Sequence, residues 1–248
     1  MSLTDDELDR YARHIVLPQI GGAGQQRLKA SRVAVVGAGG IGSAVIPALT
    51  GAGVGRLTII DSDRVELSNL HRQPLYRTAD VGQSKALLAA RGVAAANPHV
   101  EACPHERLID SSNASELLAG HELILDGTDN FATRLVVSDA AVELGIPLVS
   151  AAAQQFQGQV ALFAGRPCYR CFVGDAFDAD DCDNCAELGV LGALAASVGS
   201  IAALLAVNLL AGIPVKAGQL HLFDGVSLSW RSLAISADPS CRSCGASS

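Results

Sequence analysis

The sequence predicts an α/β fold with a Rossmann-like, mostly parallel sheet, helices on both faces and antiparallel additions. From residue 32 onward, short apolar runs alternate with helical stretches, which is typical of repeated βαβ units. A glycine-rich turn follows the first of these runs directly. With 248 residues, 49% of them hydrophobic, the chain can bury a full core. We therefore expect one domain over 1–248, comprising a helical arm (1–30), a core (31–152) and a cysteine-bearing C-terminal lobe (153–248).

The arm should begin with a helix, because Thr4 and Glu7 have the spacing of a capping box. In such a helix Leu8, Tyr11 and Ile15 share the apolar face, and Arg13 lies on the opposite face. Arg13 is then free to reach outward.

The later elements follow from the alternation of apolar runs and helical periodicity. We expect parallel strands over 32–36, 56–61, 99–104, 122–126 and 147–152, and helices over 40–52, 82–97, 112–119 and 130–144. The short connection before 157–163 predicts an antiparallel strand. A Cys- and Asp-rich loop over 165–187 precedes further strands near 219–223 and 230–235.

The run 190–213 carries no charge and is long enough to cross a bilayer. It is rich in small residues and lacks flanking basic or aromatic anchors, so we interpret it as a buried helix and expect no membrane span. The acidic N-terminus lacks a secretory signal, which predicts a cytoplasmic protein with reduced thiols. A net charge of −7 argues against a nucleic-acid partner.

The glycine-rich turn contains Gly37, Gly39 and Gly42 in G-x-G-x-x-G spacing, with Gly40 as an additional glycine. Such a turn lets phosphate oxygens approach backbone N–H groups at a helix N-terminus. Asp61, at the end of the next strand, stands where an acid usually binds a ribose hydroxyl. These features alone indicate only a nucleotide site, for which an NAD-dependent oxidoreductase is the default interpretation. A glycine turn without a ligand is the alternative.

The next segment favours a triphosphate over a dinucleotide. It adds Asn69, Arg72, Gln73 and Lys85 close to the turn. Taken singly, Arg72 and Lys85 are typical solvated surface charges, but together they suit phosphates under nucleophilic attack.

The strand over 122–126 ends in DGTDN, which places Asp126, Asp129 and Asn130 at the carboxyl edge of the sheet. A carboxylate there could bind Mg²⁺ beside phosphates. Capping of the following helix by Asp129 or Asn130 is the alternative.

Two CxxC pairs, Cys168 with Cys171 and Cys241 with Cys244, have the ligand spacing of a tetrahedral Zn²⁺ site. The C-terminal lobe is therefore expected to be zinc-bearing, with the metal tying the tail to the lobe. Redox-active dithiols are the alternative.

These motifs resemble the ThiF/MoeB/HesA family, bacterial relatives of the ubiquitin-activating enzymes. The resemblance is carried by RYARHI, GAGGIGS, TIIDSDRVELSNLHRQ, VGQSKA, DGTDN and QLHLFDGVSLSWRSLAI, the last being closest to ThiF. It implies ATP-dependent adenylation of the C-terminal glycine of a ubiquitin-like sulfur-carrier protein ending in Gly-Gly, with a separate sulfur donor protein. The product pathway, thiamin or molybdopterin, stays open.

The resemblance also implies roles for individual residues. Gly40 and Asp61 would contact adenosine, and Asn69, Arg72 and Lys85 would hold phosphates. Asp129 would act with Mg²⁺, and Arg13 would reach into the partner's site of a homodimer. Cys185 would take part in the sulfur chemistry, with Cys182 as the alternative cysteine. An NAD-dependent oxidoreductase and a non-catalytic scaffold of the same fold are the rival functions.

Overall fold

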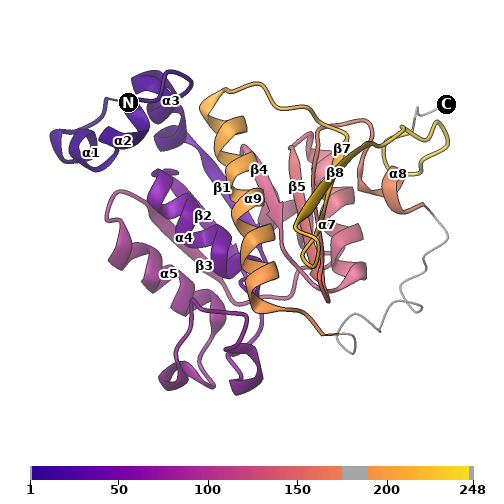
Figure 1. Ribbon diagram of the computed structural model, residues 1–248, viewed down its shortest axis with the longest axis horizontal. Coiled ribbons are helices and arrows are strands. Elements are labelled where there is room, and N and C mark those ends of the chain that lie inside the picture. Colours follow the sequence, from indigo (N-terminus) through magenta and orange to yellow (C-terminus); the bar gives the residue numbers. More distant parts are fainter. Residues whose placement is uncertain (1, 175–188, 246–248) are drawn as a thin grey trace.

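In the computed structural model, an eight-stranded sheet forms the centre of the molecule (Figure 1). The structure describes residues 2–174 and 189–245. The strand order is β3-β2-β1-β4-β5-β6-β7-β8. The strands are β1 (Arg32–Val36), β2 (Arg56–Ile60), β3 (Glu101–His105), β4 (Leu123–Asp126), β5 (Leu148–Gln154), β6 (Gln157–Phe163), β7 (Gln219–Asp224) and β8 (Ser229–Ala234). The first five are parallel and the last three are added antiparallel, which confirms the predicted architecture.

Helices cover both faces of the sheet. They are α1 (Asp5–Arg10), α2 (Ala12–Ile15), α3 (Gly21–Ala30), α4 (Gly42–Ala52), α5 (Lys85–Ala96), α6 (Ala114–Leu118), α7 (Phe131–Leu144), α8 (Tyr169–Val173) and α9 (Gly192–Ala211), with 3₁₀ turns η1 (Leu67–Asn69) and η2 (Thr78–Asp80). One core lies between the sheet and α4, α5 and α9, and a second lies under α6 and α7. The carboxyl ends of the parallel strands therefore open at one edge, between two packed layers.

The arm differs from its prediction. The capping box of Thr4 and Glu7 is present, but the helix is interrupted at Tyr11, and Leu8 is 44% exposed rather than buried. Tyr11 leaves the helical conformation because its ring packs directly under Gly53 and its hydroxyl accepts a hydrogen bond from Asn97 Nδ2 (2.8 Å). A long-range anchor thus overrides the local helical pattern.

Two helices in the described ranges were not predicted, α3 and α8. The glycines of α3 hide its periodicity; one of them, Gly24, lies against Ile20 and the carbonyl of Ala211. The helix α8 lies inside the segment that the sequence predicts to be an irregular loop, and β3 begins two residues later than predicted.

Helix α9 is long and apolar enough to cross a membrane by length and composition alone. Here it lies along the sheet beside α4, in front of the strands in Figure 1. Gly199 lies at the contact between the two helices, where a Cβ would be 2.9 Å from Ala44 Cβ. The expectation of a helix packing through small residues matches this arrangement.

Candidate nucleotide and metal sites

The glycine turn connects β1 to α4 and leaves no room for side chains at two positions. Gly37 has a φ of +90°, and a Cβ there would be 3.2 Å from the carbonyl of Gly127. A Cβ on Gly42 would be 2.2 Å from the carbonyl oxygen of Gly37. Because β1 and β4 are neighbours, the turn packs against the loop that follows β4. The glycine turn and the DGTDN loop, which the sequence assigns to the same site, are therefore adjacent.

Two side chains hold the turn at Ala38. The Ala38 N–H donates to Asp61 Oδ2 (2.7 Å), and the Tyr76 hydroxyl donates to the Ala38 carbonyl (2.7 Å). The other oxygen of Asp61 accepts from the Asp63 N–H (2.8 Å). Burial raises the pKa of Asp61, while these N–H groups oppose the rise. Asp61 therefore holds the turn in place, in addition to any contact with a ribose. Tyr76, which also holds the turn, was not predicted from the sequence.

Residues 69–85 place polar groups beside the turn. The Gln73 side chain is 3% exposed, and its Oε1 has no hydrogen-bond partner among the described residues. Its Nε2 lies 3.6 Å from where a Cβ on Gly39 would stand. A buried acceptor without a partner is costly, and a bound ligand or water would satisfy it. Asn69 Oδ1 accepts from the Glu66 N–H (3.3 Å), so this amide oxygen also shapes η1.

The predicted cations already have partners in the chain. Lys85 is almost fully buried, and its Nζ lies 2.9 Å from Asp63 Oδ2. Arg72 Nη1 donates to the Ser68 carbonyl (3.0 Å), while its backbone carbonyl lies against Gly40. Asp63 was not singled out in the sequence, although it stands in the same DSD triplet as Asp61. A phosphate would compete with this carboxylate for Lys85.

The two acidic residues of the DGTDN segment, Asp126 and Asp129, lie in different environments. Asp126 is 1% exposed, and its oxygens accept from the Thr128 N–H (3.0 Å) and hydroxyl (2.7 Å) and pair with Arg134. Asn130 caps α7 by accepting from the Thr133 N–H (2.9 Å), as the capping alternative predicted. Asp129 is exposed at the edge of the sheet. One exposed carboxylate fits Mg²⁺ shared with phosphates, and Asp126 does not.

Arg13 is exposed on α2 but lies away from this chain's own glycine turn. The neighbouring Tyr11 is anchored at Gly53, the C-cap of α4, whereas the turn lies at the N-terminal end of α4. The 11 residues of α4 span about 16 Å. The structure therefore does not bring Arg13 together with the other predicted site residues of the same chain.

The four predicted zinc ligands converge. Their sulfurs lie within 4.8 Å of one another, with Cys168 and Cys241 at 3.6 Å and Cys171 and Cys244 at 3.4 Å. A tetrahedral zinc with bonds of about 2.3 Å requires sulfurs about 3.8 Å apart, so the geometry fits. Burial raises the pKa of the Cys168 thiol, and a bound metal would instead favour the thiolate. Cys182 and Cys185 lie outside the described residues.

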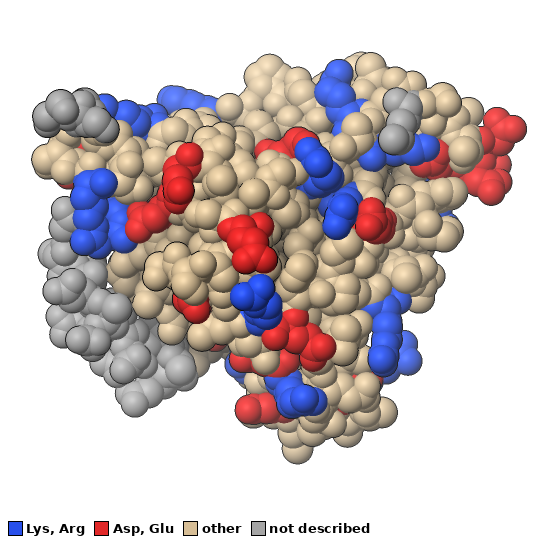
Figure 2. All heavy atoms as spheres, turned by 180° about the vertical axis from the view of Figure 1, so that it is seen from behind, with Lys and Arg blue, Asp and Glu red and all other residues tan. Residues whose placement is uncertain are grey.

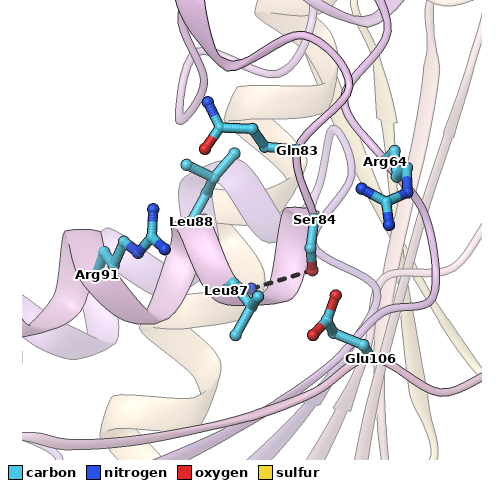
Figure 3. Close-up of a pocket in the computed structure, with 7 residues that line it drawn as sticks. All are labelled: Arg64, Gln83, Ser84, Leu87, Leu88, Arg91 and Glu106. Atoms are coloured by element: carbon cyan, nitrogen blue, oxygen red, sulfur yellow. Dashed lines mark hydrogen bonds between the residues drawn. The ribbon is translucent and has the colours of Figure 1, made fainter.

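A separate open cavity of about 250 Å³ lies between α5 and the residue after β3 (Figure 3). It is lined by Arg64, Gln83, Ser84, Leu87, Leu88, Arg91 and Glu106. In Figure 3 the carboxylate of Glu106 points toward Ser84, and Arg64 and Arg91 lie on opposite sides of the cavity. Arg64 Nη1 donates to the Gly82 carbonyl (2.8 Å). None of the predicted site residues lines this cavity, so it does not mark the glycine-turn site.

Known proteins resemble the chain over nearly all of its length. The family model described as "ThiF family" matches residues 11–243. The sulfur carrier protein adenylyltransferase of Thermus thermophilus is 47% identical over 99% of this chain and 93% of its own length. The SAMP-activating enzyme E1 of Haloferax volcanii is 41% identical over 99% and 92%. The crystal structure of E. coli MccB with ATP superposes with a TM-score of 0.83, at 20% identity over 98% of this chain and 75% of MccB, which is a likeness of fold.

Proposed function

This chain belongs to the ThiF family, and from that premise we propose that it uses ATP to adenylate the C-terminal glycine of a ubiquitin-like sulfur carrier ending in Gly-Gly. A relative at 47% identity over 99% of this chain is named a sulfur carrier protein adenylyltransferase, which makes this chain an adenylyltransferase rather than an NAD-dependent oxidoreductase or a scaffold. The observation that carries the site assignment is Gln73 Oε1, which is buried beside the glycine turn and has no hydrogen-bond partner within the described part of the chain. The product serves thiamin or molybdopterin biosynthesis in this proposal.

The reaction needs alignment and charge neutralisation more than proton transfer. The carrier carboxylate attacks the α-phosphorus of ATP; a new C–O–P bond forms, the bond between the α-phosphorus and the α,β-bridging oxygen breaks, and pyrophosphate leaves. The nucleophile is already ionised at neutral pH, so no general base is required. Lys85 and Arg72 would neutralise phosphate charge, and the glycine turn would donate N–H groups. Mg²⁺ held by Asp129 would supply further neutralisation of pyrophosphate.

Three additional roles belong to the same proposal. Zn²⁺ bound by the four clustered cysteines would join α8 to the C-terminal tail, and the sulfur spacing supports this. Arg13 would act in the site of a second subunit, because its own turn lies at the other end of α4. Cys185 would take part in transfer from a sulfur donor protein.

Pyrophosphate exchange tests the adenylation site. With ThiS-like and MoaD-like carriers ending in Gly-Gly, wild-type protein should exchange labelled pyrophosphate into ATP. Asp129→Ala should lower exchange by roughly 100-fold or more without lowering the melting temperature, because the side chain is exposed. Glu116→Ala, which removes an exposed acid of α6, is the control and should retain exchange. Full exchange by folded Asp129→Ala would refute the assignment.

A further inference from the structure

An aromatic cluster lies where α8 meets α7. Phe, Tyr and Trp make up only 4% of the chain, yet four of the described rings pack together here, with Tyr169 at the centre. The centroid of its ring is 6.4 Å from that of Phe131, 5.8 Å from that of Phe163 and 5.9 Å from that of Phe172. Aromatic rings attract one another at these distances. Because Tyr169 is only 4% exposed, a shift of its ring must displace its neighbours.

This cluster connects the two candidate sites of the chain. Tyr169 lies between Cys168 and Cys171, in the first CxxC segment. Phe131 is the first residue of α7 and comes two positions after Asp129. The contact between the two rings therefore joins the four-cysteine cluster to the loop that carries the proposed Mg²⁺-binding carboxylate. Figure 1 shows the two helices, α7 and α8, on the same side of the molecule.

Arg170 attaches the same CxxC segment to α7 at a second point. Its Nε and Nη2 donate to the two carboxylate oxygens of Asp139, at 2.6 Å and 2.5 Å, and its side chain is 8% exposed. Phe131 and Asp139 are about 12 Å apart along α7. Two contacts at this separation fix both the position and the direction of the CxxC segment relative to α7.

The start of α7 is held from two sides. On one side, Arg134 pairs with Asp126 at the end of β4. On the other side, Phe131 is half-buried against the aromatic cluster. Within the described ranges, the exposed Asp129 side chain makes no hydrogen bond or ion pair of its own. Its position therefore depends on where α7 begins.

We propose that Tyr169 is a positioning residue of the nucleotide site, through which zinc binding by the four cysteines strengthens the binding of Mg·ATP. The inference rests on the proposed function, because it requires Asp129 to act with Mg²⁺ and phosphates. Metal binding orders the segments that supply its ligands. Without the metal, the first CxxC segment is no longer tied to the C-terminal tail, and Phe131 loses its fixed packing partner. Because coupling between two sites is reciprocal, Mg·ATP must strengthen zinc binding by the same factor.

Electrostatic attraction between the two sites would not produce this effect. Among the described residues, acidic and basic side chains are interspersed over the face behind the sheet, as Figure 2 shows. A zinc ion bound by four thiolates carries a net charge of about −2, which would repel ATP. Tighter binding of Mg·ATP to the zinc-loaded protein therefore reports the packed contacts and not the charge of the metal site.

Calorimetric titration tests the coupling without measuring activity. Mg·ATP should bind the zinc-loaded protein about 10-fold more tightly than the zinc-free protein, a factor typical of coupled sites. The chelator used to remove zinc is itself removed before Mg²⁺ is added, and circular dichroism checks that the protein is folded. Competition for zinc with 4-(2-pyridylazo)resorcinol measures the reciprocal effect. Saturating Mg·ATP should raise the zinc affinity by the same factor.

Variants then test whether Tyr169 carries the coupling. Zinc-loaded Tyr169→Leu should bind Mg·ATP about 10-fold more weakly than wild type, and this affinity should no longer respond to zinc. Tyr169→Phe keeps the ring contacts and should behave as wild type. Trp230→Leu is the matched control, because it removes a ring that stacks on Phe223 at 4.5 Å outside the cluster. It should leave both the affinity for Mg·ATP and its response to zinc unchanged.

A double-mutant cycle separates positioning from general destabilisation. Because Tyr169 acts through Asp129, Tyr169→Leu should have little further effect on Mg·ATP affinity in Asp129→Ala protein. Additive effects of the two substitutions, or equal Mg·ATP affinity of wild type with and without zinc, would overturn the coupling and leave the proposed function standing. A folded, zinc-loaded wild type that binds no Mg·ATP would refute the proposed function and the coupling with it. If either the zinc-free protein or Tyr169→Leu does not fold, the other decides.

Discussion

Arg134 Nη1 lies 3.1 Å from Oδ2 of Asp126, and the two side chains are 7% and 1% exposed. The same guanidinium donates to the carbonyls of Thr128 and Ala151 and to the Ser150 hydroxyl. Arg134 therefore ties together the end of β4, the loop that carries Asp129, and β5. The position of the proposed Mg²⁺-binding carboxylate depends on a buried ion pair one turn into α7.

Replacing Arg134 by Met should be strongly destabilising. The change leaves the Asp126 carboxylate buried without its counter-charge, which costs about 3–5 kcal/mol of unfolding free energy. Urea denaturation measures this. Arg134→Met/Asp126→Asn should recover part of the loss, because the uncompensated charge is gone.

The control is Arg32→Met, which removes a half-exposed arginine paired with Glu122 at 2.8 Å. Exposed pairs contribute at most about 1 kcal/mol, so this variant should be nearly as stable as wild type. Equal effects of the Arg32 and Arg134 changes would show that the buried pair does not hold the loop.

Sequence patterns located the sheet because apolar runs and glycine turns are local signals. β1 and β6 have the predicted bounds, and the other strands differ by one or two residues at their ends. Arg134 could not be recognised in this way. In the sequence it is a single cation in an otherwise apolar helix, and its partners Asp126 and Ser150 lie on the strands β4 and β5. Only the register of β4 and β5 brings these groups together.

Lys85 shows the same limit. Its proximity to the glycine turn in sequence predicted a phosphate ligand, yet the structure pairs it with Asp63. Lys85 and Asp63, 22 positions apart in sequence, meet because the β-bridge between Arg64 and Ser84 closes the loop between them. Spacing along the chain did not reveal the ion pair between Lys85 and Asp63, which depends on how the loop closes.

The second prediction concerns the glycine turn and compares two glycine-to-alanine substitutions in the same helix, α4. Gly42→Ala should reduce ATP affinity sharply, because its Cβ would lie 2.2 Å from the Gly37 carbonyl oxygen and the turn must shift. Gly51→Ala meets nothing within 4 Å and should stabilise α4 by up to about 1 kcal/mol. Isothermal titration with ATP and thermal melting measure the two effects. Equal ATP affinity in both variants would contradict a role for the turn's geometry.

The cysteine cluster gives the third prediction, which concerns metal removal. Purified protein should contain one zinc per chain, and chelation should lower the unfolding free energy by at least about 2 kcal/mol, because metal binding contributes directly to folding. Cys241→Ser should lose the zinc and show the same instability. The loss should be concentrated in α8 and residues 236–245, where hydrogen exchange of backbone amides should accelerate.

Cys103→Ser provides the matched control for this experiment. Cys103 is a partly buried thiol in β3, outside the cluster, and its sulfur donates to Glu101 Oε1. This variant should keep its zinc and nearly all of its stability. If Cys241→Ser and Cys103→Ser melt together and both retain metal, the four sulfurs lie close without binding zinc. If the chelated protein instead forms disulfides at no cost in stability, the redox alternative replaces the structural one.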